Sequence, residues 1–281
     1  TQSPSSAASD VYKRQRIYLV YLAKHEIHLV KGEGGVFLSL ELMALIAVSS
    51  FIAAALTVPA GFGLSTILTP LVLLIMPPHE AIAVVALVHA AHNGAKTISM
   101  WESIEFSAFR RYGTWLVAGS ILGASLQGMV PQRPLLGLMG VFLVILPVLT
   151  LSETWTGYRI PEANDRIGGF GSGFMGGLSG HQGAIRAMFL SRRLPEKMGY
   201  AATASILALC VDLARIPVYL MFRPDAIIGE VGISLVLVIS AILGVRLGKK
   251  WLESLKSAFI HNCVTLGIIL SGFYYLYAAV N

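Results

Sequence analysis

The chain has 281 residues, of which 55% are hydrophobic and 13% are charged, and its formal net charge is +6. A soluble domain carries about 25% charged residues, so this composition excludes an ordinary soluble protein and predicts an all-α polytopic membrane protein. The Lys and Arg residues lie in short segments between apolar runs, which is the positive-inside pattern rather than a nucleic-acid footprint. We therefore expect the lipid bilayer, and no nucleic acid, as a partner.

The N-terminal part, residues 1–42, is interpreted as a non-native or poorly ordered extension. Its first 15 residues resemble translated vector sequence, and the first methionine, Met43, opens the first clean apolar run. These residues are set aside in predicting the fold. An amphipathic surface helix over 16–31 is left open.

Residues 43–152 are expected to form a first transmembrane repeat that begins with a broken helix. Its first arm, 43–59, ends at a proline and a glycine-rich stretch. Its second arm, 64–76, is short for a crossing, which needs about 20 residues, so the pair predicts a helical hairpin with its tip inside the membrane. Three spans should follow, over 80–101, 113–131 and 134–152, with Arg110 and Arg111 in the loop 102–112.

Residues 153–166 are polar and form the predicted cytoplasmic linker to a second transmembrane repeat, 167–281. That repeat should open with a second hairpin over 167–191, whose tip lies at 180–183. Further spans are predicted over 197–222, 226–246 and 257–280.

Matching positions indicate that the two halves are repeats. Gly63 and Gly183 are 120 residues apart, as are Ala81 and Ala201, and Lys96 and Arg215 are 119 apart. Matches at a nearly constant offset and in the same order indicate a duplication. Each half has an odd number of crossings, so the repeats are expected to be inverted, which is a common plan in secondary transporters.

The distribution of Lys and Arg predicts the orientation. The segments that share one side of the membrane carry 11 of these residues and the opposite loops carry 2; the first group is 102–112, 153–166, 191–197 and 246–256, and the second is 77–80, 131–134 and 222–225. This bias places the first group in the cytoplasm and the C-terminus outside.

The two hairpin tips are the candidate substrate-binding site. A half-helix N-terminus presents unpaired N–H groups and the positive end of the helix dipole, which together bind anions. The first tip offers this geometry with Gly61, Phe62, Gly63, Ser65 and Thr66. The second tip offers Gly180, His181, Gln182 and Gly183, and Arg186 follows by one turn with no carboxylate nearby in the sequence.

Charged residues within the predicted spans are further candidates, because a charge in hydrocarbon usually faces a cavity or a partner. The cations are Lys96, Arg186 and Arg215, and Asp212 is the deep carboxylate. Asp212 and Arg215 are three residues apart and could pair on one helix face. Lys96 could bind the ligand or could equally extend to the interface.

Two histidines, His89 and His92, are three residues apart in the span after the first hairpin. Interhelical hydrogen bonds are their plain interpretation, because a metal site needs at least three or four ligands. His92 is 120 residues from Asp212, which makes His92, Asp212 and His89 the candidates for proton coupling. We predict no metal, no cofactor and no enzymatic activity, since the glycines of 169–174 follow no strand and are not a dinucleotide fingerprint.

A glycine-rich tip, then a proline, then an Ala-containing span, with a related copy in the second half, resembles the TauE/SafE sulfite-exporter family. The first copy runs from Gly61 through Pro70 to Ala81, and the resemblance covers 43–280. The second copy departs from this pattern, because it has fewer glycines, lacks the proline and adds Arg186.

The resemblance implies a multi-pass secondary transporter of the bacterial inner membrane that moves sulfite, an organosulfonate or a related anion. Proton coupling and export are the family-implied mode. A small sulfur-containing anion between the tips is therefore the expected partner, and a homodimer is left open. The alternatives are a passive anion channel and a metal-cation transporter that uses His89, His92 and Asp212.

Overall fold

A computed structural model describes residues 30–32, 35–37, 40–60, 63–156, 164–190, 193–194, 196–222, 224–228, 230–254 and 257–280. The chain divides into two units, Thr1–Val48 and Ser49–Asn281. In the first unit, strands β1 (Val30–Gly32) and β2 (Gly35–Phe37) form an antiparallel pair. This pair was not predicted, because residues 1–42 were set aside as an extension. The suggested surface helix over 16–31 falls almost entirely outside the described residues.

The second unit is helical throughout its described residues. Helix α2 (Leu40–Ala60) runs into it from the first unit. The elements that follow are α3 (Ser65–Val72), α4 (Pro78–Ser99), a 3-10 turn (Trp101–Ser103), α5 (Phe106–Gln127), α6 (Gln132–Thr156), α7 (Asp165–Ser179), α8 (Gln182–Leu190), α9 (Lys197–Phe222), α10 (Pro224–Ile228), α11 (Val231–Ser254) and α12 (Ser257–Val280).

Helix bounds agree with the prediction where apolar runs end sharply, as they do for α9 and α12. The predicted loop 102–112 is wrong in its second half, because α5 already begins at Phe106 and contains Arg110 and Arg111. The predicted span 226–246 is likewise replaced by α10 and a longer α11. Hydropathy locates the apolar part of a helix, whereas the backbone hydrogen bonds continue through its charged ends.

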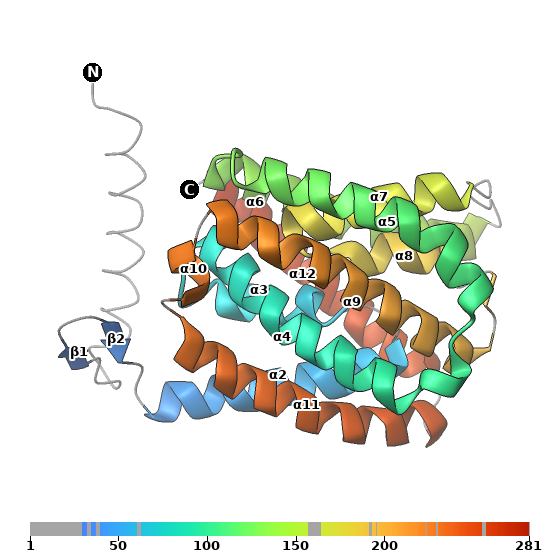
Figure 1. Ribbon diagram of the computed structural model, residues 1–281, viewed down its shortest axis with the longest axis horizontal. Coiled ribbons are helices and arrows are strands. Elements are labelled where there is room, and N and C mark those ends of the chain that lie inside the picture. The colour runs from blue at the N-terminus through green and yellow to red at the C-terminus, as the bar shows by residue number, and fades with distance from the viewer. Residues whose placement is uncertain are drawn as a thin grey trace. The chain divides into compact units, whose positions relative to one another are not determined.

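The long helices pack as neighbours in pairs. Helix α5 lies beside α7, and α6 lies beside α12 (Figure 1). Helix α4 packs against both α9 and α11. Glycines let the backbones touch: a Cβ at Gly173 of α7 would lie 1.9 Å from the Leu116 carbonyl oxygen of α5. A Cβ at Gly244 of α11 would similarly lie 2.4 Å from the Phe51 carbonyl oxygen of α2. Close contact through small residues is the usual way in which membrane helices associate.

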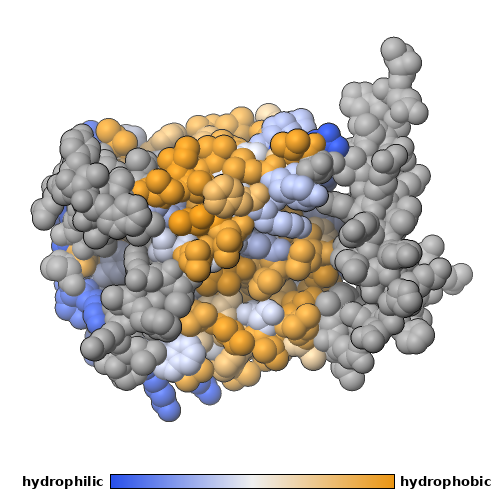
Figure 2. Space-filling view, turned by 180° about the vertical axis from the view of Figure 1, so that it is seen from behind, coloured by the Kyte–Doolittle hydropathy of each residue, from blue (hydrophilic) through white to orange (hydrophobic). Residues whose placement is uncertain are grey.

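A large buried apolar cluster of the described residues lies between α4, α6 and α12 and includes Ile82, Met139 and Ile268. Outside it, α9 and the Val231–Trp251 part of α11 are long and apolar enough to cross a membrane. Large apolar side chains are also exposed on α11 and α12, among them Leu235, Ile239, Leu266, Leu270 and Phe273. Figure 2 shows a broad hydrophobic area across the middle of one face, with hydrophilic residues gathered toward its edges. Such a surface is suited to contact with lipid.

Candidate substrate site between two broken helices

The second break separates α7 from α8. Helix α7 ends at Ser179, and Gly180 adopts a left-handed φ of 82° while its N–H donates to the Gly176 carbonyl over 2.9 Å. Glycine adopts this conformation at little cost, so the helix stops here. Helix α8 then begins at Gln182, and its first amides have no preceding turn to bond.

The first break precedes α3, and Gly61 and Phe62 of this tip lie outside the described residues. Gly63 is described, and it ends the tip in a tight turn. The amide of Thr66 donates to the Gly63 carbonyl over 3.1 Å, and the Thr66 hydroxyl donates to the same oxygen over 2.6 Å. Helix α3 begins at Ser65 immediately after this turn.

The structure brings the two tips into contact. The Ser65 hydroxyl donates to the Gly180 carbonyl over 2.5 Å. A Cβ at Gly63 would lie 3.9 Å from the Gly183 Cα, and a Cβ at Gly180 would lie 3.6 Å from the Ser65 Cβ. The tips therefore touch at Ser65 and Gly180, and an added Cβ at Gly63 or Gly180 would reach the other tip at ordinary van der Waals distance.

The hydroxyls of the first tip are already used as donors. Ser65 gives its proton to Gly180, and Thr66 gives its proton to Gly63. A hydroxyl has one proton to donate, so neither group has a donor left for a bound anion. This part of the predicted site thus joins and shapes the tips, and any anion contact here would come from backbone amides.

The second tip is different, because it holds buried polar atoms without a partner among the described residues. They are both amide atoms of Gln182, Nε and Nη1 of Arg186, and Nε2 of His181. The three side chains are only 0–3% exposed. Buried polar groups are nearly always hydrogen-bonded, so this cluster of unpartnered polar atoms, with donors on Gln182 and Arg186, points to a ligand.

His181 is oriented by its neighbours rather than by a polar partner on Nε2. Its ring meets Tyr275 of α12 edge-on, with 5.9 Å between the ring centroids, and its Nδ1 lies 3.4 Å from the Ser179 Oγ. The Tyr275 hydroxyl is itself buried without a partner in the described part of the chain. Tyr275 therefore adds a polar atom from α12 beside the second tip, which sequence analysis did not single out.

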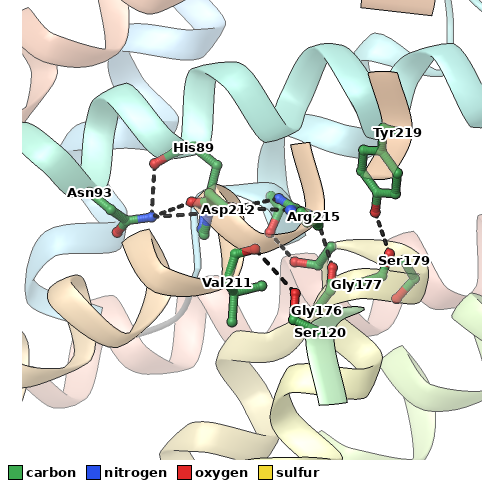
Figure 3. Close-up of polar contacts among 12 residues, drawn as sticks. His89, Asn93, Ser120, Gly176, Gly177, Ser179, Val211, Asp212, Arg215 and Tyr219 are labelled. Carbon is green, nitrogen blue, oxygen red and sulfur yellow. Dashed lines mark hydrogen bonds and ion pairs between the residues drawn. The ribbon is translucent and has the colours of Figure 1, made fainter. Parts of the chain in front are cut away.

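A buried network beside the tips is centred on Asp212 of α9 (Figure 3). His89 Nδ1 lies 2.7 Å from Asp212 Oδ2, and Arg215 Nε donates to Oδ1 over 3.0 Å. The carboxylate can only accept, so Nδ1 carries the imidazole proton. The side-chain amide of Asn93 donates to the His89 carbonyl over 2.8 Å, and this bond fixes the orientation of that side chain. The Asp212–Arg215 pair that the spacing allows is thus present.

Arg215 also closes the end of α7. Its Nη1 donates to the Gly176 carbonyl over 2.8 Å, and Tyr219, one turn further along α9, donates to the Gly177 carbonyl. Positive charge at a helix C-terminus is favourable because it opposes the negative end of the helix dipole. Arg215 is therefore engaged with Asp212 and with α7, whereas Arg186 is not. Tyr219 was missed by sequence analysis, although its spacing from Arg215 was a usable signal.

Of the three candidates for proton coupling, His89 and Asp212 are in contact, whereas His92 bonds elsewhere. His92 Nε2 lies 3.3 Å from the Ala54 carbonyl of α2, whereas His89 is the histidine on Asp212. The difference arises from the rotation of α4 about its axis, which an offset between repeats does not fix. The remaining Nε2 of His89 is directed at the first tip, 3.2 Å from where a Cβ of Gly63 would lie.

Lys96 lies two turns beyond His89 on α4 and is only 5% exposed. No hydrogen bond or ion pair of its ammonium is found among the described residues. Ligand contact and extension of the ammonium to the interface both stay predictions for Lys96. Lys96 and Arg186 are the two buried cations without a carboxylate partner in the described part of the chain.

Apolar helices that enclose two broken helices, with their tips in contact beside buried, unpartnered donors, define a membrane transporter. The chain matches the family described as "Sulfite exporter TauE/SafE" over residues 46–275, and it belongs to that family. Membership implies membrane transport of the sulfite-exporter type. Comparisons with curated proteins and with solved structures gave no match.

Proposed function

We propose that the protein is a secondary transporter that binds a small sulfur oxoanion between the two tips and exports it. The observation that carries this proposal is the set of buried donors on Gln182 and Arg186, which lack partners among the described residues and adjoin the start of α8. The backbone amides of Gly183 and its neighbours would add donors and the positive end of the helix dipole. His181 would line the site from the same tip.

Charge supports an anion as the ligand. A buried charge that lacks a partner costs roughly 3–5 kcal/mol, and an anion beside Arg186 removes that cost. Neither Lys96 nor Arg186 belongs to an ion pair of the described residues. A metal cation would instead add to this positive charge, and the described residues contain no group of three or more potential metal ligands.

The test is sulfite transport by purified protein in liposomes. Arg186→Ala removes charge-assisted hydrogen bonds worth about 1.5–3 kcal/mol, so the transport efficiency should fall roughly 10- to 100-fold. Arg110→Ala is the matched control, because Arg110 is exposed on α5. Equal sulfite transport by the wild type and Arg186→Ala would remove Arg186 from the site.

The buried His89–Asp212 pair is the proposed proton carrier. With Nδ1 bonded to Asp212, a second proton would bind Nε2, which faces the tip, and would turn that acceptor into a donor for the anion. A bound anion beside the tips would offset the positive charge of a doubly protonated ring. A proton and a dianion that bind together carry a net negative charge, which an inside-negative membrane potential drives outward.

Coupling can be tested with His89→Gln, which keeps a polar side chain but cannot titrate. We expect sulfite flux in this variant to lose its accompanying proton movement, measured with a pH-sensitive dye in the liposomes. Proton movement at the wild-type ratio would show that another group carries the proton. A passive channel, the alternative mode, would never concentrate sulfite against its gradient in either protein.

The arrangement of the two halves supports inverted repeats as part of the proposal. In the proposed repeats, α2 corresponds to α7 and α5 corresponds to α11. Helix α5 packs against α7, and α11 packs against α2, so the same contact between the halves occurs twice. The central pairs α4 with α9 and α6 with α12 join equivalent helices. With the Lys and Arg bias of the sequence, this arrangement suggests a C-terminus outside the inner membrane. Reaction of an engineered C-terminal cysteine with an impermeant thiol reagent in intact cells would test that orientation.

A further inference from the structure

Three tyrosines lie near the end of α12, and one of them differs from the other two. Tyr274 and Tyr277 are exposed, whereas Tyr275 is 0% exposed. A tyrosine near the end of a membrane helix usually keeps its ring in the apolar layer and its hydroxyl in water. That role accounts for the two exposed tyrosines. It does not account for Tyr275, whose buried hydroxyl has no hydrogen-bond partner among the residues that the structure describes.

The ring of Tyr275 has a structural role that its hydroxyl does not share. The ring belongs to the buried apolar cluster between α4, α6 and α12. A phenylalanine would fill the same space without a polar atom, and burial of a hydroxyl that bonds nothing is unfavourable. Packing therefore explains the aromatic ring at this position and leaves the hydroxyl unexplained.

Glycines on both helices fix the position of Tyr275 against α6. A Cβ at Gly140 of α6 would lie 2.7 Å from Leu276 Cγ, and a Cβ at Gly272 of α12 would lie 2.8 Å from Val144 Cγ2. The two helices thus approach closely just before and just after Tyr275 in the sequence. A group that is held in place before a ligand arrives loses little freedom on binding it.

The Tyr275 ring also meets the second tip. It lies edge-on to His181, with 5.9 Å between the ring centroids. His181 and the adjacent Gln182 keep buried polar atoms that have no partner in the described part of the chain. Helix α12 packs in addition against α3, the helix that follows the first tip. Tyr275 therefore adds another unpartnered polar group beside the tip, from a helix that belongs to neither hairpin.

We infer that Tyr275 is a substrate-binding residue, and that its hydroxyl donates a hydrogen bond to an oxygen of the anion. The inference rests on the proposed anion site and extends that site from the two tips to α12. A phenol hydroxyl has one proton to donate, and a charged oxygen is a stronger acceptor for it than a neutral one. Binding of the anion gives the buried hydroxyl the partner that it otherwise lacks.

The test is Tyr275→Phe, which keeps the ring and its contact with His181 and removes only the hydroxyl. The KM for sulfite in liposomes should rise about tenfold or more, because a hydrogen bond to a charged ligand is lost. The Tm in detergent without sulfite should be unchanged or higher, because the hydroxyl bonds no described residue. At one sulfite concentration, the ligand should raise the Tm of the wild type more than that of the variant.

Two other tyrosines provide matched controls. Tyr274→Phe removes an exposed hydroxyl from the neighbouring position and should leave the KM and the Tm unchanged. Tyr112→Phe removes a buried hydroxyl that donates to the Gly168 carbonyl over 2.7 Å, so its Tm should fall by about 2–4 °C. The second control shows how stability responds when a buried hydroxyl does have a partner in the protein.

The possible failures can be told apart. An unchanged KM in Tyr275→Phe, with sulfite still transported by the wild type, would overturn the inference and leave the proposed function standing. A fall in Tm like that of Tyr112→Phe would also overturn it, because the hydroxyl would then bond the protein. A wild type that moves no sulfite would overturn the proposed function, and the inference with it.

Discussion

The two tips have related sequences and touch each other, yet their polar groups are used in opposite ways. In the first tip, the Ser65 and Thr66 hydroxyls both donate to carbonyls of the protein. In the second tip, Gln182 and Arg186 keep donors that have no partner among the described residues. Two similar broken helices thus differ in function: the side-chain donors of the first tip are bonded within the protein, whereas those of the second tip are available to a ligand.

This difference gives the two tips separate roles: the first tip sets the shape of the site, and the second tip sets its affinity for the ligand. The first tip is joined to the second by the hydrogen bond from Ser65 to Gly180, so only its backbone is left for ligand binding. The second tip supplies the side chains that would recognise charge. Substitutions in the first tip should therefore change stability, whereas side-chain substitutions in the second should change transport kinetics.

The largest effect is expected from a substitution at the Gly180 turn of the second tip, and it should fall on stability. Gly180→Ala puts a Cβ on a left-handed backbone, at about 1–2 kcal/mol, and within 3.0 Å of Arg215 Nη1, so a loss of about 2 kcal/mol or more is expected. Gly171→Ala on α7, where a Cβ meets nothing within 4 Å, is the control and should be neutral or slightly stabilising. The measurement is the free energy of unfolding of the protein in detergent. Equal stability of the two variants would contradict the role of the Gly180 turn.

The breaks themselves were predictable from sequence, and their partners were not. Gly180 and the short arm after it located the second tip, and Arg186 stood out as a cation without a local carboxylate. The Asp212–Arg215 pair followed from spacing, because residues three apart share a helix face. The partner of His89 did not follow, because it depends on how α4 and α9 are rotated against each other.

Sequence also does not show whether a polar side chain bonds a ligand or another group of the protein. Arg215 was expected among the ligand-binding cations, but the structure uses it to hold Asp212 and the end of α7. Ser65 was expected to offer a donor, but that donor is given to Gly180. A sequence shows which groups are available, and only the packing shows which of them are already satisfied.

The second largest effect is expected for Gln182→Leu, which keeps the size of the side chain and removes its donors. Loss of one ligand hydrogen bond of about 1–1.5 kcal/mol should raise the KM for sulfite about tenfold. Stability should not fall, because the Gln182 amide atoms have no partner in the described part of the chain to lose. Gln132→Leu, at an exposed position at the start of α6, is the matched control. An unchanged KM together with lower stability would reverse the roles of the two tips.

The smallest effect is expected for Ser65→Ala, and it should fall on stability alone. The substitution leaves the buried Gly180 carbonyl without its hydroxyl donor, which costs about 1 kcal/mol. The KM for sulfite should stay within about twofold, because the hydroxyl proton already belongs to Gly180 and not to the ligand. Ser125→Ala removes an exposed hydroxyl that donates to Ile121 within α5, and it should leave stability unchanged within about 0.5 kcal/mol. A tenfold rise in KM for Ser65→Ala would mean that the first tip exchanges its internal bond for the anion, and the two tips would then bind in the same way.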